Sequence, residues 1–237
     1  MSEKEVLEIL GVKVLLGDST TVFFNVAKLH TQNKIDVPVI IERSKIPGPT
    51  VLVTAGIHGD EINGVEIVRQ LIAKGINKPK KGTIICIPVI NVFGFIQMDR
   101  EFPDGRDLNR VFPGSRNGAL ASRVAHKLTQ EVIPHADLIL DFHTGGADRF
   151  NSAQIRITKG DKSLEELAEV FGAPFIYNSK NLNKSFRNTA FKLGIPMLLF
   201  EGGKSFNIDS KITNSGVNGV KRVLHHLGML RLKYKVT

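Results

Sequence analysis

Short apolar runs and stretches of alternating polarity recur along the chain, and their spacing predicts most of its strands. In the first fifty residues, β-branched and aromatic positions alternate with polar ones between Gly, Asp and Asn, which is typical of half-buried strands. Later apolar runs are continuous, as expected for strands buried on both faces of a sheet. The predicted strands are 12–16, 21–28, 35–43, 51–55, 83–90, 138–142, 154–158, 174–177 and 195–201, and residues 231–236 also alternate like a strand.

Between several of these strands, apolar residues recur at helical spacing. Residues 62–72 place isoleucine, valine and leucine on overlapping faces, and Gly75 follows near the end. Another helical segment opens with Ser163 and Glu166, which form a capping-box pattern. The predicted helices are 62–72, 119–132, 163–171, 186–193 and 212–227.

The alternation of strands and helices predicts the fold class. It indicates an α/β protein with a mixed, mainly parallel central sheet that is covered by helices on both faces. We expect the N-terminal strands, within residues 10–45, to be integrated in this sheet. We see neither an internal repeat nor a linker, so residues 1–237 are interpreted as a single domain.

Composition narrows the classes of protein that remain. Hydrophobic residues make up 42% of the chain, which excludes a disordered protein. The net charge of +9 comes from scattered basic residues, and tryptophan is absent, which argues against a nucleic-acid arm or stacking platform. A positive surface also suits small anionic substrates, or simply solubility. The lone Cys86 lies in an apolar run, so we interpret it as a buried small hydrophobe.

The N-terminal segment and the lengths of the apolar runs suggest where the protein resides. The first ten residues include acidic side chains and lack a long apolar core, so we expect no secretory signal. No run approaches the ~18 apolar residues that span a bilayer. We therefore expect a cytoplasmic protein without membrane or nucleic-acid partners, and a homo-oligomer remains open.

Metal-binding residue types follow the first continuous apolar run. His58 and Glu61 lie three positions apart in a predicted turn, where Gly56 and Gly59 allow unusual backbone angles. This spacing lets an imidazole nitrogen and a carboxylate oxygen reach one cation. Each residue also has an ordinary alternative: His58 as a hydrogen-bonded loop histidine, and Glu61 as a charge favoured by the helix dipole.

A second histidine, His143, follows another apolar run, in DLILDFHTGG. A single histidine at a strand end is more often a plain hydrogen-bonding residue. Together with His58 and Glu61, however, it completes two imidazoles and one carboxylate, a ligand set of catalytic zinc sites that leaves one position for water. We therefore expect one Zn²⁺ per chain, although manganese, cobalt or nickel suits the same donors.

A long stretch without periodicity, residues 91–117, carries several charged side chains. Arg100, Arg106, Asn109 and Arg110 crowd this predicted loop. So long a loop in a compact domain is usually functional. Guanidinium groups bind carboxylates in a bidentate manner and can stabilise an oxyanion. We expect some of these charges to be structural, with Arg106 the first candidate.

A glutamate ends another predicted strand, at the start of the sequence Glu201-Gly-Gly. A carboxylate at the rim of an apolar site can accept a proton from a nucleophilic water. The alternative is a solvated charge at a strand end. Ligands bind at the carboxyl ends of strands in open α/β sheets, and all four polar segments are predicted to lie there.

Taken together, these segments resemble the succinylglutamate desuccinylase/aspartoacylase family of the zinc carboxypeptidase superfamily. The resemblance extends from about residue 35 to 230. It rests on motifs in the family's order, which are His58 with Glu61, DLNR at 107–110, His143, and Glu201-Gly-Gly. Its most specific part is the loop pattern D-R-x-x-P-D-G-x-D-L-N-R-x-F-P-G.

The resemblance implies a role for each site residue. By this resemblance, the metal ligands are His58, Glu61 and His143. The catalytic residues are Glu201 and Arg100, and the substrate-binding residues are Asn109, Arg110 and Arg156. Glu201 would act as general base and then acid, and Arg100 would polarise the scissile carbonyl. Family members usually continue into a C-terminal β-rich module near the site entrance. This sequence stops just after the last predicted helix; if the protein has no such module, we expect a more open pocket, and a truncated form would look the same.

We therefore expect a zinc-dependent hydrolase that cleaves an amide bond in a small carboxylate-bearing substrate, such as an N-acyl amino acid. Carboxypeptidase action on peptides needs the same groups, so the sequence alone does not distinguish this alternative function from a deacylase. A domain that binds zinc and a carboxylate without turnover is the alternative from another class. A third alternative, nucleic-acid binding, is supported only by the net charge of the chain.

Overall fold

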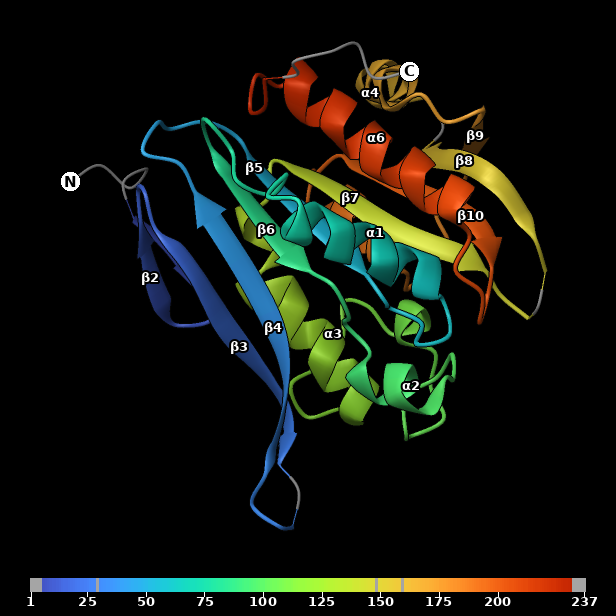
Figure 1. Cartoon of the computed structure of the whole chain (residues 1–237). Coiled ribbons are helices and arrows are strands. Elements are labelled where there is room, and N and C mark those ends of the chain that lie inside the picture. The colour runs from blue at the N-terminus through green and yellow to red at the C-terminus, as the bar shows by residue number, and fades with distance from the viewer. Residues whose placement is uncertain (1–5, 29, 148, 159, 232–237) are drawn as a thin grey trace.

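An eight-stranded sheet forms the centre of the molecule (Figure 1). The computed structural model describes residues 6–28, 30–147, 149–158 and 160–231. The strand order is β3-β4-β6-β5-β7-β10-β8-β9. In chain order these strands are β3 (Ser19–Lys28), β4 (Lys34–Arg43), β5 (Thr50–Ala55), β6 (Thr83–Ile87), β7 (Leu138–Gly145), β8 (Asn151–Thr158), β9 (Phe175–Ser179) and β10 (Met197–Lys204).

The sheet is mixed, with its parallel strands at the centre. Strands β6, β5, β7 and β10 pair in parallel with one another, as do β8 and β9. The pairs β3–β4, β4–β6 and β10–β8 are antiparallel. The predicted fold class, a mixed and mainly parallel sheet with helices on both faces, is confirmed.

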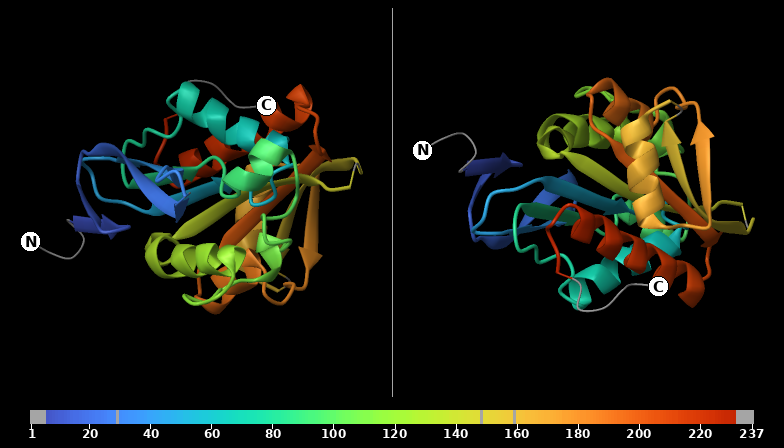
Figure 2. Two further views of the ribbon diagram at one scale, coloured as in Figure 1. Left: turned by 90° about the horizontal axis from the view of Figure 1, so that it is seen from below. Right: turned by 90° about the horizontal axis from the view of Figure 1, so that it is seen from above.

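Helices cover both faces of the sheet (Figure 2). One face packs against α1 (Ile62–Ala73), α4 (Lys162–Phe171) and α6 (Ser210–His226). The other packs against α2 (Val92–Gln97), α3 (Leu120–Glu131) and α5 (Phe186–Lys192), with the short 3₁₀ turns η1 (Leu108–Arg110) and η2 (Ile133–His135). Each face has its own apolar core, because the central strands are buried on both sides.

The N-terminal strands divide between two sheets, which corrects part of the prediction. Strands β3 and β4 join the central sheet, but β2 (Val12–Leu15) pairs with β1 (Val6–Ile9) in a separate two-stranded sheet. Ile9 and Val14 are fully buried in the core on the α3 face. The small sheet is therefore attached by apolar packing and not by strand pairing.

Several predicted elements also differ in their boundaries. The stretch 91–117 contains α2 and η1, and the predicted strand 83–90 ends at Ile87. The capping box at Ser163 is wrong, because Asp161 caps α4 by accepting hydrogen bonds from the backbone N–H groups of Ser163 and Leu164. The predicted strand at 231–236 lies outside the described residues, apart from Arg231.

The structure also tests the predictions about Cys86 and about membrane-spanning segments. Cys86 is a free, fully buried thiol, and burial raises its pKa to about 12. Across the part of the chain that the structure describes, no helix combines the length and apolar character needed to cross a bilayer.

Three neighbouring parallel strands position the polar groups of interest. In the sheet order, β5, β7 and β10 are adjacent, so the segments that follow their apolar runs meet at one edge. The register places Glu201 of β10 directly beside His143 of β7. Both strands continue past the apolar runs from which they were predicted, to Gly145 and Lys204.

Candidate active site

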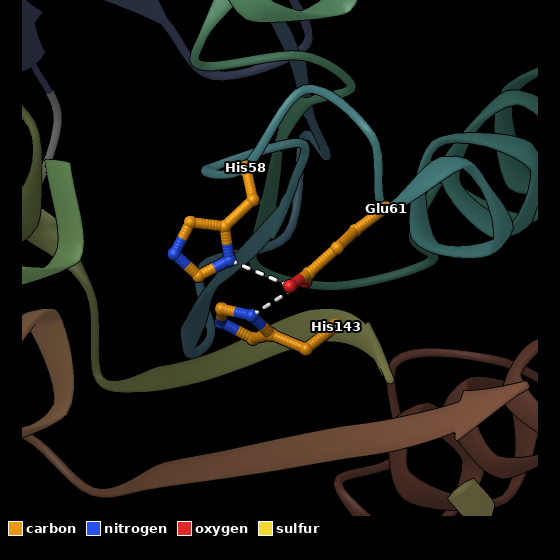
Figure 3. Close-up of side chains that lie close together, drawn as sticks. All are labelled: His58, Glu61 and His143. Carbon is orange, nitrogen blue, oxygen red and sulfur yellow. Dashed lines mark hydrogen bonds and ion pairs between the residues drawn. The ribbon is translucent and has the colours of Figure 1, made fainter. Parts of the chain in front are cut away.

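His58, Glu61 and His143 reach one point from three different elements (Figure 3). His58 lies in the turn between β5 and α1, Glu61 is the N-cap residue of α1, and His143 lies in β7. The turn passes very close to α2, since a Cβ at Gly59 would collide with the backbone of Gly94. A glycine is therefore required beside His58 to let the turn bring the imidazole over the sheet edge.

The three side chains form a compact and buried cluster. The Glu61 carboxylate lies between the two imidazoles, 2.7 Å from Nδ1 of His58 and 2.9 Å from Nδ1 of His143. One ligand atom of each residue lies within 4.8 Å of the others. Each residue is at most 5% exposed. Glu61 lies at the N-terminus of α1, where the helix dipole favours a negative charge, but its carboxylate makes no helix-capping hydrogen bond and contacts the two imidazoles instead.

A second carboxylate contacts the far nitrogen of each imidazole. Asp107 Oδ1 lies 3.0 Å from Nε2 of His58, and Asp141 Oδ2 lies 2.8 Å from Nε2 of His143. Thr54 Oγ1 in turn donates a hydrogen bond to Asp141. A neutral imidazole has one N–H, so it can donate to only one of its two carboxylate neighbours. With Nε2–H directed at the outer aspartate, both Nδ1 lone pairs point towards Glu61, as metal ligands with outer-sphere carboxylates do.

The titration behaviour follows from this crowding of carboxylates. Burial alone lowers the pKa of His143, but Asp141 and Glu61 outweigh it and hold the pKa well above 6.5. The pKa of His58 is raised in the same way against burial, by Glu61 and Asp107. Burial raises the pKa of Glu61, yet the two histidines outweigh it and hold that pKa far below its usual range. The cluster therefore demands positive charge, either as two protons or as a cation, and its buried His₂Glu donor set fits a divalent metal.

Glu201 lines the same pocket on the other side of His143. Asn151 Nδ2 donates a 2.8 Å hydrogen bond to Oε1 of Glu201. Arg156 Nε forms an ion pair with Oε2 at 2.6 Å, and the Arg156 guanidinium lies 5.7 Å from the centre of the Tyr177 ring. Glu201 is therefore a held carboxylate and not a freely solvated charge at a strand end.

Arg100 contacts the metal-binding cluster directly. Its Nη1 donates a 3.1 Å hydrogen bond to Glu61, and its Nε and Nη2 donate to Asp107 at 3.2 and 2.9 Å. Burial lowers the pKa of Arg100, but Asp107 and Glu61 outweigh it, so the pKa is raised. Arg100 thus cross-links two carboxylates of the site at the edge of the pocket.

The two predicted substrate-binding residues of η1 both line the pocket, but they differ in burial and in hydrogen bonding. Asn109 is largely buried, and its Oδ1 accepts a hydrogen bond from the backbone N–H of Phe186. Arg110 is exposed, and its Nη1 donates to the carbonyl oxygen of Asn109. Arg106 instead pairs with Asp104 at 3.5 Å and is absent from the residues that line this pocket.

Arg187 is a pocket residue that the sequence reasoning did not identify. It lies in the first turn of α5 and is only 8% exposed. Nη2 donates to Ser179 Oγ and to the carbonyl oxygen of Lys180, whereas Nη1 has no hydrogen-bond partner among the described residues. Burial and the nearby Arg156 lower its pKa. A buried guanidinium with an unsatisfied nitrogen is costly unless an anion joins it.

The site as a whole is a small polar pocket. Its volume is about 150 Å³, and its walls include the three candidate metal ligands, Glu201 and a ring of basic side chains. Every residue predicted for the site lines this pocket, which therefore joins a candidate metal site, a carboxylate that can accept a proton, and anion-binding groups.

Comparison with models of known protein families shows which family the chain belongs to. The model of the succinylglutamate desuccinylase/aspartoacylase catalytic domain matches residues 47–227. The chain belongs to the succinylglutamate desuccinylase/aspartoacylase family. The matched range contains all the residues of the predicted site and all the strands that carry them.

Relatives of this family agree with that assignment. The chain is 29% identical over 212 residues to an N-alpha-acetyl-L-2,4-diaminobutyric acid deacetylase of Halomonas elongata, a match that covers 84% of this chain and 60% of that protein. Among solved structures, a succinylglutamate desuccinylase/aspartoacylase from Rhodobacter sphaeroides has 26% identity and a TM-score of 0.79, with 93% of this chain and 68% of that chain covered.

A further structure, the product-bound ectoine utilization protein EutE (DoeB) from Ruegeria pomeroyi, shares the fold. It has a TM-score of 0.83 at 20% identity and covers all of this chain and 75% of that one. The chain thus spans less than two thirds of the length of its curated relative and about three quarters of this structural one.

Proposed function

We propose that the protein is a zinc-dependent amidohydrolase that removes the acyl group from a small carboxylate-bearing substrate, such as an N-acyl amino acid. The observation that supports this most strongly is the meeting of His58, Glu61 and His143 beside Glu201 in one pocket. Membership of a family that includes deacylases supports the reaction type.

His58, Glu61 and His143 would hold the metal. When bound there, zinc would lower the pKa of a water molecule towards ~7 and polarise the substrate carbonyl. Asp107 and Asp141 would fix the tautomer of each histidine, so that both Nδ1 atoms are available as ligands.

Glu201 is the group best placed to move protons. It lies beside His143 in the register of β7 and β10, and it lines the pocket that the metal ligands also line. In the proposed reaction, Glu201 accepts a proton from the attacking water and then donates it to the departing amine. Arg156 and Asn151 hold the Glu201 carboxylate in place from the adjacent strand.

The basic side chains of the pocket explain the preference for a carboxylate-bearing substrate. Arg187 offers an unsatisfied nitrogen, and the exposed Arg110 lines the same pocket. A substrate carboxylate bound at Arg187 would satisfy the buried guanidinium, which a neutral amide cannot do. Arg100 would contribute to stabilising negative charge on the carbonyl oxygen, as the family resemblance implies.

The direct test is hydrolysis of N-acetyl amino acids by the zinc-loaded protein, followed by the same assay on Glu201→Gln. We expect kcat to fall by roughly 10²–10⁴-fold in this variant, because the general base is lost. The exposed Glu166→Gln on α4 is the matched control and should retain wild-type activity. Wild-type turnover by Glu201→Gln would refute the role of Glu201.

The same assay separates deacylation from the carboxypeptidase alternative. Faster cleavage of N-acetyl amino acids than of unblocked dipeptides supports the proposal. The opposite order would favour a peptidase, and binding of both compounds without any cleavage would favour a binding domain.

A further inference from the structure

A second and larger cavity lies next to the metal pocket. It has a volume of about 540 Å³, compared with about 150 Å³ for the metal pocket. Its walls come from residues 106–122, which include η1 and the start of α3, and from residues 183–192, which include the whole of α5. We call it the basic groove.

The basic groove is lined by positive charge. Four basic side chains line it, which are Arg106, Arg110, Lys184 and Lys192, and no aspartate or glutamate is found among its described lining residues. Arg106 is partly neutralised by Asp104. The other three form no ion pair with a carboxylate in the described parts of the chain. Ser122 and Asn188 add neutral hydrogen-bonding groups to the wall.

One short segment separates the groove from the metal pocket. Leu182 and Ser185 line the metal pocket, whereas Asn183 and Lys184 between them line the groove. Arg110 lines both cavities. A ligand held at Arg110 would therefore lie at the boundary between the two cavities.

The dividing segment is held firmly in place. The backbone N–H of Phe112 donates to the carbonyl oxygen of Lys184, and the backbone N–H of Phe186 donates to Asn109 Oδ1. The rings of Phe112 and Phe186 stack with their centres 5.2 Å apart. Both rings are buried, and Phe112 also lines the groove, so this part of its wall is continuous with the apolar core.

We propose that the basic groove binds an anionic tail, made of carboxylate or phosphate groups, on a substrate whose scissile amide lies in the metal pocket. This inference rests on the proposed function, which it deepens by naming the substrate class as an acylated, extended polyanion. Scattered surface lysines usually attract only solvent. Here they converge with arginines on a concave wall whose described lining holds no carboxylate, so that a ligand's charges would be met from several sides.

Binding to a Lys184→Gln/Lys192→Gln double variant tests the inference. Both residues are exposed, so their replacement should not affect folding. The matched control is Lys162→Gln/Lys211→Gln, which removes the same charge from α4 and α6 on the opposite face of the sheet. All proteins are zinc-loaded and carry Glu201→Gln so that no ligand is consumed during calorimetric titration.

Three acetylated peptides serve as probes: triglutamate, a peptide with two phosphoserines, and neutral triglutamine. We expect an anionic peptide to bind about tenfold more tightly than the neutral one, and this preference to be lost in the groove variant only. The tighter anionic peptide identifies the tail as carboxylate or phosphate. Equal binding of charged and neutral peptides, or an equal loss in the control variant, would overturn the inference.

Hydrolysis by proteins with Glu201 intact separates this inference from the proposed function. If no N-acyl compound is cleaved while the groove preference persists, the proposed function fails and the groove is retained. If N-acetyl amino acids are cleaved but a charged tail brings no advantage in kcat/KM, the groove inference fails and the function is retained.

Discussion

Each histidine of the site lies between two carboxylates, and this arrangement governs its chemistry. Glu61 contacts Nδ1 of both rings, while Asp107 and Asp141 contact the Nε2 atoms. Three buried or partly buried acids around two imidazoles are stable only with compensating positive charge. The residues thus favour a bound cation and also fix which nitrogen faces it.

Arg187 provides a test of substrate recognition at the level of one side chain. Replacing Arg187 by Lys keeps the charge but removes the fork that reaches the pocket, so we expect KM for an N-acetyl amino acid to rise by roughly 10–100-fold with a smaller change in kcat. Steady-state kinetics measure both constants.

Arg222→Lys is the matched control for that variant. Arg222 donates two hydrogen bonds to the carbonyl oxygen of Phe171, away from the pocket. It should therefore leave KM unchanged. An unaltered KM in Arg187→Lys would show that this residue only supports the fold.

Single residues differ in how far the sequence alone predicts them. His58, Glu61 and His143 stand beside apolar runs in recognisable spacing, and the structure brings them together as expected. Arg187 stands in an ordinary helical segment, and its burial arises only when α5 packs beside the end of β9. The contact of Asp107 with His58 joins residues 49 positions apart, which no local pattern encodes.

At the level of elements, the site depends on a close contact between the turn after β5 and helix α2. We expect Gly59→Ala to destabilise the protein by about 2–4 kcal/mol, because its methyl group would collide with the backbone at Gly94. Zinc affinity should fall too, since the same turn carries His58. Chemical denaturation and zinc titration measure the two effects.

Gly75→Ala is the control for the Gly59→Ala variant. Gly75 has a positive φ of 65°, but a Cβ there would meet no atom within 4 Å. Gly75→Ala should therefore cost only about 1 kcal/mol, from backbone strain alone. Equal losses in the two variants would contradict the importance of the contact with α2.

Element boundaries were predictable where apolar residues mark them and not elsewhere. The continuation of β10 to Lys204 depends on its ladder with β7 and β8, which polar and glycine residues also join. Helix α2 is too short for a periodic signal and buries only Gly94. The pairing of β2 with β1 is a choice of partner that an alternating pattern cannot specify.

At the level of the whole molecule, the raised pKa values of His58 and His143 predict how stability changes with pH. The folded chain holds these protons to a higher pH than the unfolded chain, whose histidines titrate near 6.5. Their contribution is therefore fully present below pH 6.5 and is lost as the pH rises through the folded-state values.

The melting temperature should show this effect in the zinc-free protein and not in the zinc-loaded one. We expect Tm of the zinc-free protein to fall as pH rises from neutral to alkaline values. Excess zinc should flatten this fall, because the cation replaces the two protons as the compensating charge. Parallel Tm curves with and without zinc would contradict a metal at this cluster.

The most direct test of the account is the zinc content of the dialysed protein by elemental mass spectrometry, compared between wild type and His143→Ala. With His226→Ala as an exposed control on α6, the account predicts about one zinc per chain in wild type and control, and close to none in His143→Ala. A full equivalent of zinc in His143→Ala would contradict the assignment of the site.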